Sequence, residues 1–208
     1  MHFPADRRPP AALLACLLVG ILAGCGAKTP EESAPPPAES APEGAPEAGF
    51  LPAADEGAED CGDAGELSVD LFGAISGQVR WTADVLRCEG MPRPDGAGAR
   101  LRFAGPFGPD EQPIAFIVAV PSLQQGATGS ELPSNVTLIA EGQGRFFSTP
   151  DLEDCWTDIS SQTPLEVEGA FSIEGQIYCI APLPEVNGGG SVSIDEFTFS
   201  GLVDWSGT

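Results

Sequence analysis

Histidine and lysine are almost absent from this chain of 208 residues, in which His2 and Lys28 are the only ones. The stretch from Cys61 onward therefore has no imidazole and no lysine amine. The first absence excludes Ser-His-Asp and Cys-His catalysis there, together with the commonest transition-metal ligand. The second excludes Schiff-base and Ser-Lys mechanisms, because each needs a lysine. We expect a protein without catalytic residues.

Positive charge is also scarce, since 9 Lys and Arg stand against 31 Asp and Glu and leave a net charge of −22 at pH 7. Such a surface repels nucleic acid and anionic lipid, so neither is an expected partner. No glycine-rich loop lies between a strand and a helix, and nucleotide binding is without support. The carboxylates either keep a secreted domain soluble or attract divalent or basic partners.

A long apolar run is missing as well. The N-terminal run at residues 11–23 has 13 residues, whereas a membrane-spanning helix needs about 20. Arg7 and Arg8 precede this run and small residues follow it, which is the pattern of a secretory signal peptide. The sequence therefore predicts export.

The signal ends in Leu22-Ala23-Gly24-Cys25. This tetrapeptide resembles the lipobox of bacterial lipoproteins. The resemblance implies that residues 1–24 are removed, that Cys25 is lipidated, and that its acyl chains anchor the protein with about 0.8 kcal/mol per buried CH₂. Gly26, in place of an aspartate, implies the outer membrane, with the protein facing the periplasm or the cell surface. The resemblance covers no more than these first residues.

Residues 25–60 are rich in proline, alanine and glutamate. They contain too few large apolar side chains to offset the entropy lost on ordering, so we expect a disordered tether. Its reach lies between about 30 Å for a flexible coil and about 110 Å for an extended proline-type helix. A single folded domain, residues 61–208, is expected to follow it.

Four cysteines remain for this domain once Cys25 is lipidated and the signal is removed. An even number in an exported domain indicates two disulfides, for which three pairings exist. We favour pairing within Cys61 and Cys88 and within Cys155 and Cys179, because each pair brackets one strand-turn-strand stretch. Each bridge would contribute about 3.5 kcal/mol through loop closure.

The domain has short apolar alternations separated by Gly, Pro, Asn and Asp, and it lacks long helical periodicity. This pattern predicts an all-β fold, an antiparallel β-sandwich or flattened barrel of eight to ten strands. The expected strands are residues 67–72, 75–81, 99–103, 114–120, 136–140, 145–148, 165–168, 170–173, 176–180 and 191–205. Residues 114–120 are apolar on both faces and predict a central strand. The last strand is expected to bend at residues 195–196, where its alternation slips.

Predictions are also made for three further segments. Residues 85–88 are expected to continue the sheet of the first two strands. Residues 122–134 are polar and contain glycine, so we expect an exposed loop. Glu174 and Gly175 are expected to form a tight turn between two short strands.

Residues 75–81 and residues 199–205 are a short internal repeat, which we call the echo segments, and each has the pattern apolar-Ser-Gly-x-Val-x-Trp. We expect these two segments to pair or pack together. Trp81 and Trp205, at equivalent places, are either buried core residues or a surface on which a glycan stacks. Trp156 is a third tryptophan that a glycan site would use.

Two further groups of side chains are candidate sites. Arg100 and Arg102 alternate on one strand and either clamp an anion or offset carboxylates of a neighbouring strand. The densest carboxylate cluster is Asp151, Glu153, Asp154 and Asp158, a candidate calcium site that lacks the EF-hand spacing. A glycosidase needs two carboxylates about 5–10 Å apart, and no pair in the sequence is indicated.

These observations favour a non-enzymatic lipoprotein of the cell envelope, a binding or structural module without a cofactor, held by its lipid anchor. Its partner would be an envelope protein or a glycan. The first alternative is a carbohydrate-binding or carbohydrate-cleaving domain. The second is a calcium-dependent adhesion module.

Overall fold

The computed structural model describes residues 59–63 and 65–206. The strands in chain order are β1 (Glu59–Asp60), β2 (Glu66–Gly73), β3 (Gly77–Thr82), β4 (Arg87–Pro92), β5 (Ala99–Phe107), β6 (Gln112–Val120), β7 (Gly129–Ala140), β8 (Arg145–Ser148), β9 (Cys155–Pro164), β10 (Ala170–Cys179), β11 (Leu183–Pro184) and β12 (Ser191–Asp204). Two short 3-10 helices, η1 (Glu141–Gln143) and η2 (Leu152–Asp154), lie before β8 and β9. Within this part of the chain, no helix has the length and apolarity needed to cross a membrane.

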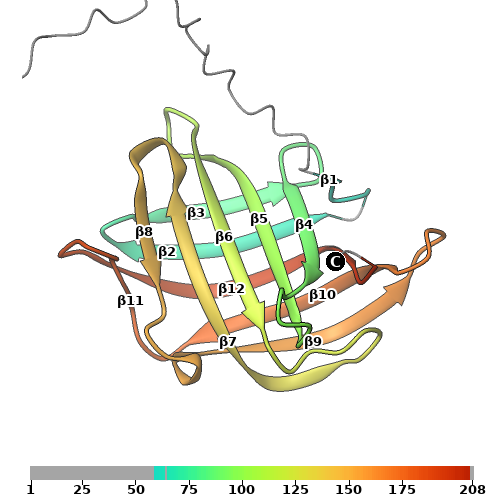
Figure 1. Cartoon of the computed structure of the whole chain (residues 1–208). Helices are drawn as coiled ribbons and strands as arrows, with labels where there is room; N and C mark the ends of the chain where they lie inside the picture. Colours follow the sequence, from blue (N-terminus) through green and yellow to red (C-terminus); the bar gives the residue numbers. More distant parts are fainter. Residues whose placement is uncertain (1–58, 64, 207–208) are drawn as a thin grey trace, which may run out of the picture. The chain divides into compact units, whose positions relative to one another are not determined.

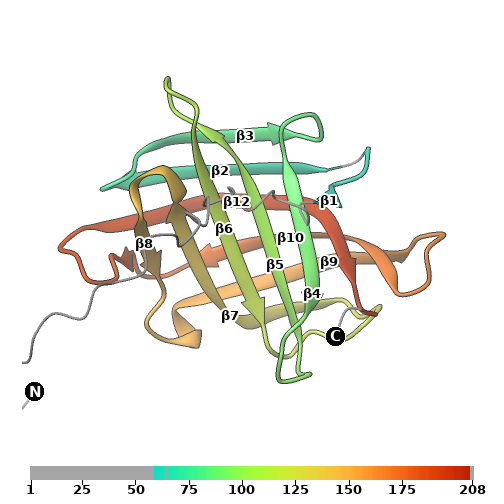
Figure 2. The same ribbon diagram turned by 45° about the horizontal axis from the view of Figure 1, so that its top comes forward.

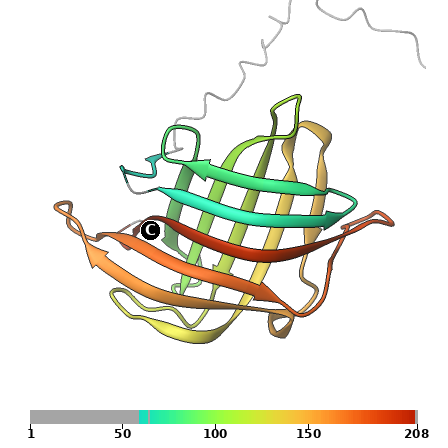
Figure 3. The same cartoon turned by 180° about the vertical axis from the view of Figure 1, so that it is seen from behind.

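The strands form two antiparallel sheets packed face to face, which confirms the predicted sandwich. Sheet A contains β1, β4, β5, β6, β8 and the second half of β7. Sheet B contains the first half of β7 followed by β9, β10, β12, β2 and β3, with β11 beside β12. In Figures 1 and 3 the strands of the two sheets cross steeply. The arrangement is therefore an orthogonal packing rather than an aligned one.

Strand β7 belongs to both sheets and makes the corner between them. Gly129–Ser134 pairs with β9, and Asn135–Ala140 pairs with β6. The register shifts between Gly129 and Leu132, and Glu131 has a positive φ of 53°. A bulge of this kind bends a strand from one sheet into the next. The predicted loop at residues 122–134 was thus wrong from Gly129 onward, because pairing with a distant strand outweighs the polar local sequence.

The connection from β3 to β4 crosses between the sheets. The amides of Val85 and Leu86 both donate to Thr82 O, at 3.0 Å, in a turn that leads away from β3. Strand β4 then pairs with β5 in sheet A. The prediction that residues 85–88 continue the first sheet was wrong. Gly90 lies where β4 crosses β12, and a Cβ there would meet Leu202 O at 2.2 Å.

Aromatic side chains fill the space between the sheets. Figure 2 shows both layers around this interior. Phe116 contacts Trp81 and Phe197, with ring centroids 6.0 and 5.0 Å apart, and Phe103 contacts Phe199 at 5.1 Å. Phe116 lies on β6, which is flanked by β5 and β7 as the apolar run predicted. These contacts join the two inner faces into one core.

Sheet B differs from the prediction in its β9–β10 hairpin. Residues 170–179 form one continuous strand that passes through Glu174 and Gly175 without a turn, and the bulge opposite them lies on β9, where Ser160 is the extra residue. Residues 165–168, expected to be a strand, are the exposed connection between β9 and β10. In β10 the alternation of buried and exposed side chains continues through Glu174 and Gly175. The local turn signal was therefore misleading.

The final strand bends as predicted. The register of β12 against β2 shifts between Asp195 and Thr198, and Glu196 has a positive φ of 49°. The two echo segments do not pair directly. Strand β2 lies between β3 and β12, so the segments are second neighbours in one sheet.

Both disulfides have the predicted pairing, Cys61–Cys88 and Cys155–Cys179. The first joins the start of the domain to β4. The second joins directly opposed residues of β9 and β10. Each closes a loop of 24–27 residues, which contributes about 3.5 kcal/mol in the chain-entropy view.

Candidate functional site

The outer surface of sheet B is densely acidic, and we call it the acidic face. Its outward positions and bulges carry Glu66, Asp70, Glu131, Asp158, Glu174, Asp195, Glu196 and Asp204. Arg80 is the only basic side chain on the described strands of this sheet. Alternation places these groups outward, because each strand buries its apolar residues against sheet A.

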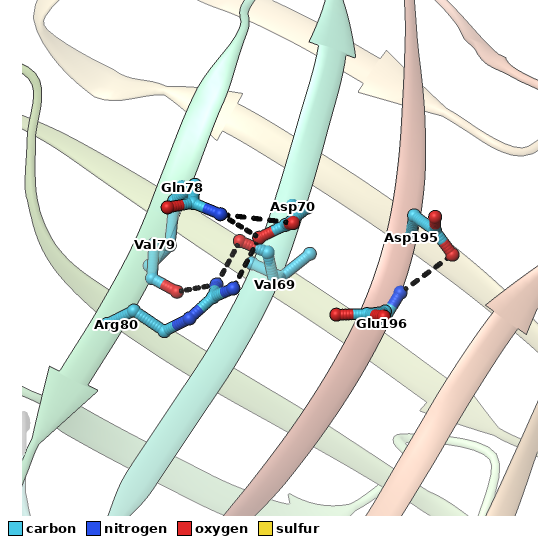
Figure 4. A network of polar contacts seen from close by, with 7 residues as sticks. All are labelled: Val69, Asp70, Gln78, Val79, Arg80, Asp195 and Glu196. Atoms are coloured by element: carbon cyan, nitrogen blue, oxygen red, sulfur yellow. Dashed lines mark hydrogen bonds and ion pairs between the residues drawn. The ribbon is translucent and has the colours of Figure 1, made fainter.

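Arg80 is engaged by its own neighbours (Figure 4). One guanidinium nitrogen lies 2.5 Å from Asp70 Oδ1, and another donates to Val69 O and Val79 O at 2.9 and 2.7 Å. Gln78 donates to the same carboxylate at 3.3 Å. The hydrogen bond from Arg80, followed by that from Gln78, holds the pKa of Asp70 below its ordinary value against the opposing effect of burial. The single cation of this face is thus already neutralised.

Asp195 lies on β12 directly opposite Asp70 on β2, as the register and Figure 4 show. Like charges at opposed positions of antiparallel strands destabilise the pair. Arg80 neutralises Asp70, whereas Asp195 accepts the amide N–H of Glu196 at 3.0 Å. Two carboxylates of β12 therefore project at the bulge close to a third on β2.

A stacked aromatic pair lies at one end of the acidic face. Trp156 and Tyr178 are opposed on β9 and β10, with ring centroids 5.7 Å apart and an interplanar angle of 19°. Tyr178 is 38% exposed. Burial, and then the charges of Glu131 and Asp158, raise the pKa of Tyr178. The disulfide Cys155–Cys179 joins the preceding cross-strand pair and so holds the two rings opposite each other.

Two adjoining depressions of about 420 and 390 Å³ cross the acidic face, and we call them together the furrow. Ser160, Gly175 and Thr198 line both. Carboxylates and an amide complete the lining: Glu66 and Glu174 in the first, Asp158 and Gln176 in the second. The furrow follows from small side chains at the β9 bulge and opposite it, where a Cβ on Gly175 would meet Asp158 O at 2.4 Å.

The outer surface of sheet A has a different charge, and we call it the arginine face. Arg87, Arg100 and Arg102 lie on outward positions of β4 and β5. Arg102 donates to Glu141 of η1 at 2.7 Å, so it offsets a carboxylate, although one from a helix rather than from a strand. Arg100 shares the face but pairs across the strands with Met91 and Ala119. The structure does not join the two arginines in a clamp.

A groove of about 650 Å³ crosses the arginine face between the β3–β4 turn and η1. Its floor is formed by Ala104, Gly105 and Pro106 of β5. The charged groups that line it have both signs: Arg87, Arg102, Asp84, Glu111 and Glu141. This mixture gives no preference for an anion.

Trp81 and Trp205 hold the fold rather than forming a binding surface. Trp81 is 3% exposed, packs on Gly105 and donates its indole N–H to Pro106 O at 2.8 Å. Trp205 is half-buried against the core and donates to Gln162 Oε1 at 3.0 Å. Gln162 in turn donates to Gln124 O at 2.9 Å, so Trp205 is part of a structural network.

The four carboxylates considered for calcium are not brought together. Asp154 accepts the amide N–H of Asp151 at 3.3 Å and caps η2. Asp158 instead lies on β9, where it accepts from Glu131 N and Gln176 Nε2 at 2.7 and 3.0 Å. Glu153 is exposed on η2. Among the residues that the structure describes, no three His, Cys, Asp or Glu side chains are grouped so as to hold a metal ion.

Sequence reasoning missed the pairing of Trp156 with Tyr178. A signal for it was present, because each aromatic residue is adjacent to a cysteine of one predicted bridge. If those cysteines oppose each other on antiparallel strands, their neighbours are opposed on the other face. Cys25 and residues 25–58 of the expected tether lie outside the described residues, whereas Glu59 and Asp60, which were assigned to the tether, form β1 by pairing with β4.

Comparison of the chain with protein-family models, curated proteins and solved structures finds no match.

Proposed function

We propose that this protein is a non-enzymatic, lipid-anchored binding module of the bacterial cell envelope, held at the outer membrane by Cys25. The acidic face is its binding surface. One observation carries the proposal: a sheet held by a disulfide presents the exposed Tyr178, stacked on the half-buried Trp156, beside concentrated carboxylates and a furrow. Such convergence of aromatic and polar groups on a rigid element is typical of recognition sites.

The carboxyl groups favour binding over cleavage of a substrate. A glycosidase needs one carboxyl group with a raised pKa, so that it stays protonated and donates. In Asp70, Glu185 and Asp204 the pKa is lowered, in each case chiefly by a hydrogen bond from a neighbouring side chain, namely Arg80, Arg145 and Ser206. These three groups are held ionised, so none of them is the proton donor that cleavage requires.

The anchor and the binding surface are tested separately. Labelling cells with an alkyne-bearing palmitate, followed by outer-membrane fractionation, should mark the protein and lose the mark in a Cys25→Ala variant. In-cell crosslinking followed by mass spectrometry should recover a partner from the wild type and not from a Tyr178→Ala variant with unchanged abundance. Equal recovery from both would remove the acidic face as the binding surface.

Carbohydrate binding is a second candidate function, favoured by the exposed Trp156–Tyr178 stack. Aromatic rings with adjacent hydrogen-bonding side chains also recognise sugars. A glycan array probed with the wild type and with Trp156→Ala tests this candidate. Signals that are lost in the variant while its melting temperature stays within a few degrees would support it.

A further inference from the structure

We propose that the acidic face binds an extended basic segment of another polypeptide, whose lysine or arginine side chains lie along the furrow and over Tyr178. This inference rests on the proposed binding function and names its partner. Four observations carry it: the separation of charge between the two faces, two carboxylates at the β12 bulge without a cationic partner among the described residues, the setting of the aromatic stack, and the carboxylates at both ends of the furrow.

Charge is divided between the two outer surfaces. The acidic face carries eight carboxylates and one arginine, and that arginine is bonded to Asp70 at 2.5 Å. On the arginine face, β4 and β5 carry Arg87, Arg100 and Arg102 with Glu89, and Asp84, Glu111 and Glu141 line the groove beside them. Carboxylates that served only solubility would be expected on both surfaces with interspersed cations. Their concentration on one face creates a potential that attracts and orients a basic partner.

Asp195 and Glu196, at the β12 bulge, have no cationic partner among the described residues. Arg80 turns to Asp70, and Asp195 bonds only an amide N–H among its described contacts. Glu196 adds a third carboxylate at a backbone φ of 49°, which a residue other than glycine adopts only at a cost. A bound ammonium or guanidinium group would offset the charges of Asp195 and Glu196, whereas a neutral sugar would leave them in place.

The aromatic pair is also set for a cation. Trp156 stacks on Tyr178 with ring centroids 5.7 Å apart, and Tyr178 is 38% exposed. Glu131 and Asp158 lie near enough to Tyr178 to act on it electrostatically. A ring surrounded by carboxylates binds ammonium and guanidinium groups through the ring face and the charges together.

The furrow favours an extended segment. Glu66 and Glu174 line its first depression and Asp158 its second, and the two depressions share their central lining. Basic side chains spaced along an extended chain would reach both ends. The small side chains between them, Ser160 and Thr198, would accommodate the backbone.

The experiment measures binding of a fluorescein-labelled peptide of six Lys-Gly repeats to the full mature chain in an uncharged detergent at 150 mM NaCl. The face variant E66Q/E174Q/D195N should bind at least tenfold more weakly than the wild type. The matched control D110N/E166Q/E168Q removes the same charge from exposed turns and should change affinity less than twofold. Equal losses in both variants would overturn the inference, since the attraction would then reflect total charge.

Aromatic variants separate a basic segment from a glycan. Tyr178→Ala should weaken peptide binding about threefold, and Tyr178→Phe should restore it because the ring face is kept. If peptide binding ignores both changes while a neutral glycan is bound and lost in Tyr178→Ala, the occupant is a sugar and the inference is wrong, although the proposed function stands. If neither probe binds and crosslinking recovers no partner, the proposed function fails with it.

Discussion

The two outer surfaces of the sandwich share one core and differ in charge. On sheet A, Arg102 is paired with Glu141 and the groove beside it contains both signs. On sheet B, the only arginine on the strands is neutralised, and carboxylates surround a stacked aromatic pair. Because both sheets meet the same requirement for burial, folding does not explain this difference. The comparison teaches that the carboxylates are concentrated on one outer surface instead of being interspersed with cations over both. Solubility alone does not require this pattern.

The largest expected effect is on the free energy of unfolding, and it distinguishes the buried Trp81 from the half-buried Trp156. Trp81→Ala removes a side chain that is 3% exposed and contacts Phe116, and it should lower the free energy of unfolding by about 4 kcal/mol. Trp156→Ala on the acidic face should cost about 1 kcal/mol, the size of a lost aromatic pair. Urea denaturation of both variants checks this. Similar costs would mean that Trp156 is a core residue and that the aromatic pair is structural.

Removal of a disulfide comes next. C155A/C179A and C61A/C88A should each lower the free energy of unfolding by about 3.5 kcal/mol, because the closed loops are of similar length. Only the first should also change the near-ultraviolet circular dichroism of the Trp156–Tyr178 pair in the folded state, because that bridge lies beside it. The same spectral change in both variants would show that the bridge does not position the rings.

A smaller and opposite effect is expected at the paired carboxylates. Asp195→Asn removes the repulsion with Asp70 and keeps an oxygen for the amide of Glu196, so stability should rise by about 0.5 kcal/mol. Asp110→Asn, in an exposed turn, is the control and should be neutral. Thermal unfolding of both variants at low ionic strength gives the comparison. A gain in stability together with weaker peptide binding is the expected signature of a residue kept for function.

The smallest effect concerns pH. The pKa of Asp70 in the folded protein lies below its ordinary value of 3.8, chiefly because Arg80 bonds its ionised form. The pair therefore contributes stability above pH 3.8, and that contribution is lost as pH falls through the lower, folded pKa. Arg80→Gln should return the carboxyl titration toward 3.8 and flatten this acid loss. Carbon-detected NMR titration of the Asp70 carboxyl group measures it, and an unchanged titration would exclude Arg80 as the cause.

Much of the fold was predictable because its signals are local. Alternation identified β2, β3, β5 and β12, and the apolar run identified β6. The bracketing of strand-turn-strand stretches by cysteines predicted both disulfides. Errors arose where distant pairing overrides local sequence: the start of β7, the continuity of β10 and the sheet to which β4 belongs. The turn signal at Glu174 and Gly175 is the same whether the chain reverses there or continues past a bulge in the neighbouring strand β9.

The candidate site was predictable only in part. The sequence left two alternatives for Trp81 and Trp205, core residues or a glycan surface, and the structure places Trp81 in the core and bonds the half-buried Trp205 to Gln162. Tyr178 carried no signal of its own, because its importance depends on which residue faces it. The opposition of Asp70 to Asp195 likewise requires the register between strands that are distant in sequence.

The sequence by itself determined the fold class, the disulfide pairing and the excess of negative charge. Alternation and cysteine spacing are local features of the sequence, and net charge is a sum over its residues. It also predicts the lipid anchor at Cys25. The tertiary structure decided how that charge is divided, because a sheet brings carboxylates from β2, β9, β10 and β12 onto one surface and aligns them by hydrogen-bonded register. The face on which a side chain lies, and the side chains beside it, depend on pairing between strands that are distant in sequence. Composition does not contain this information.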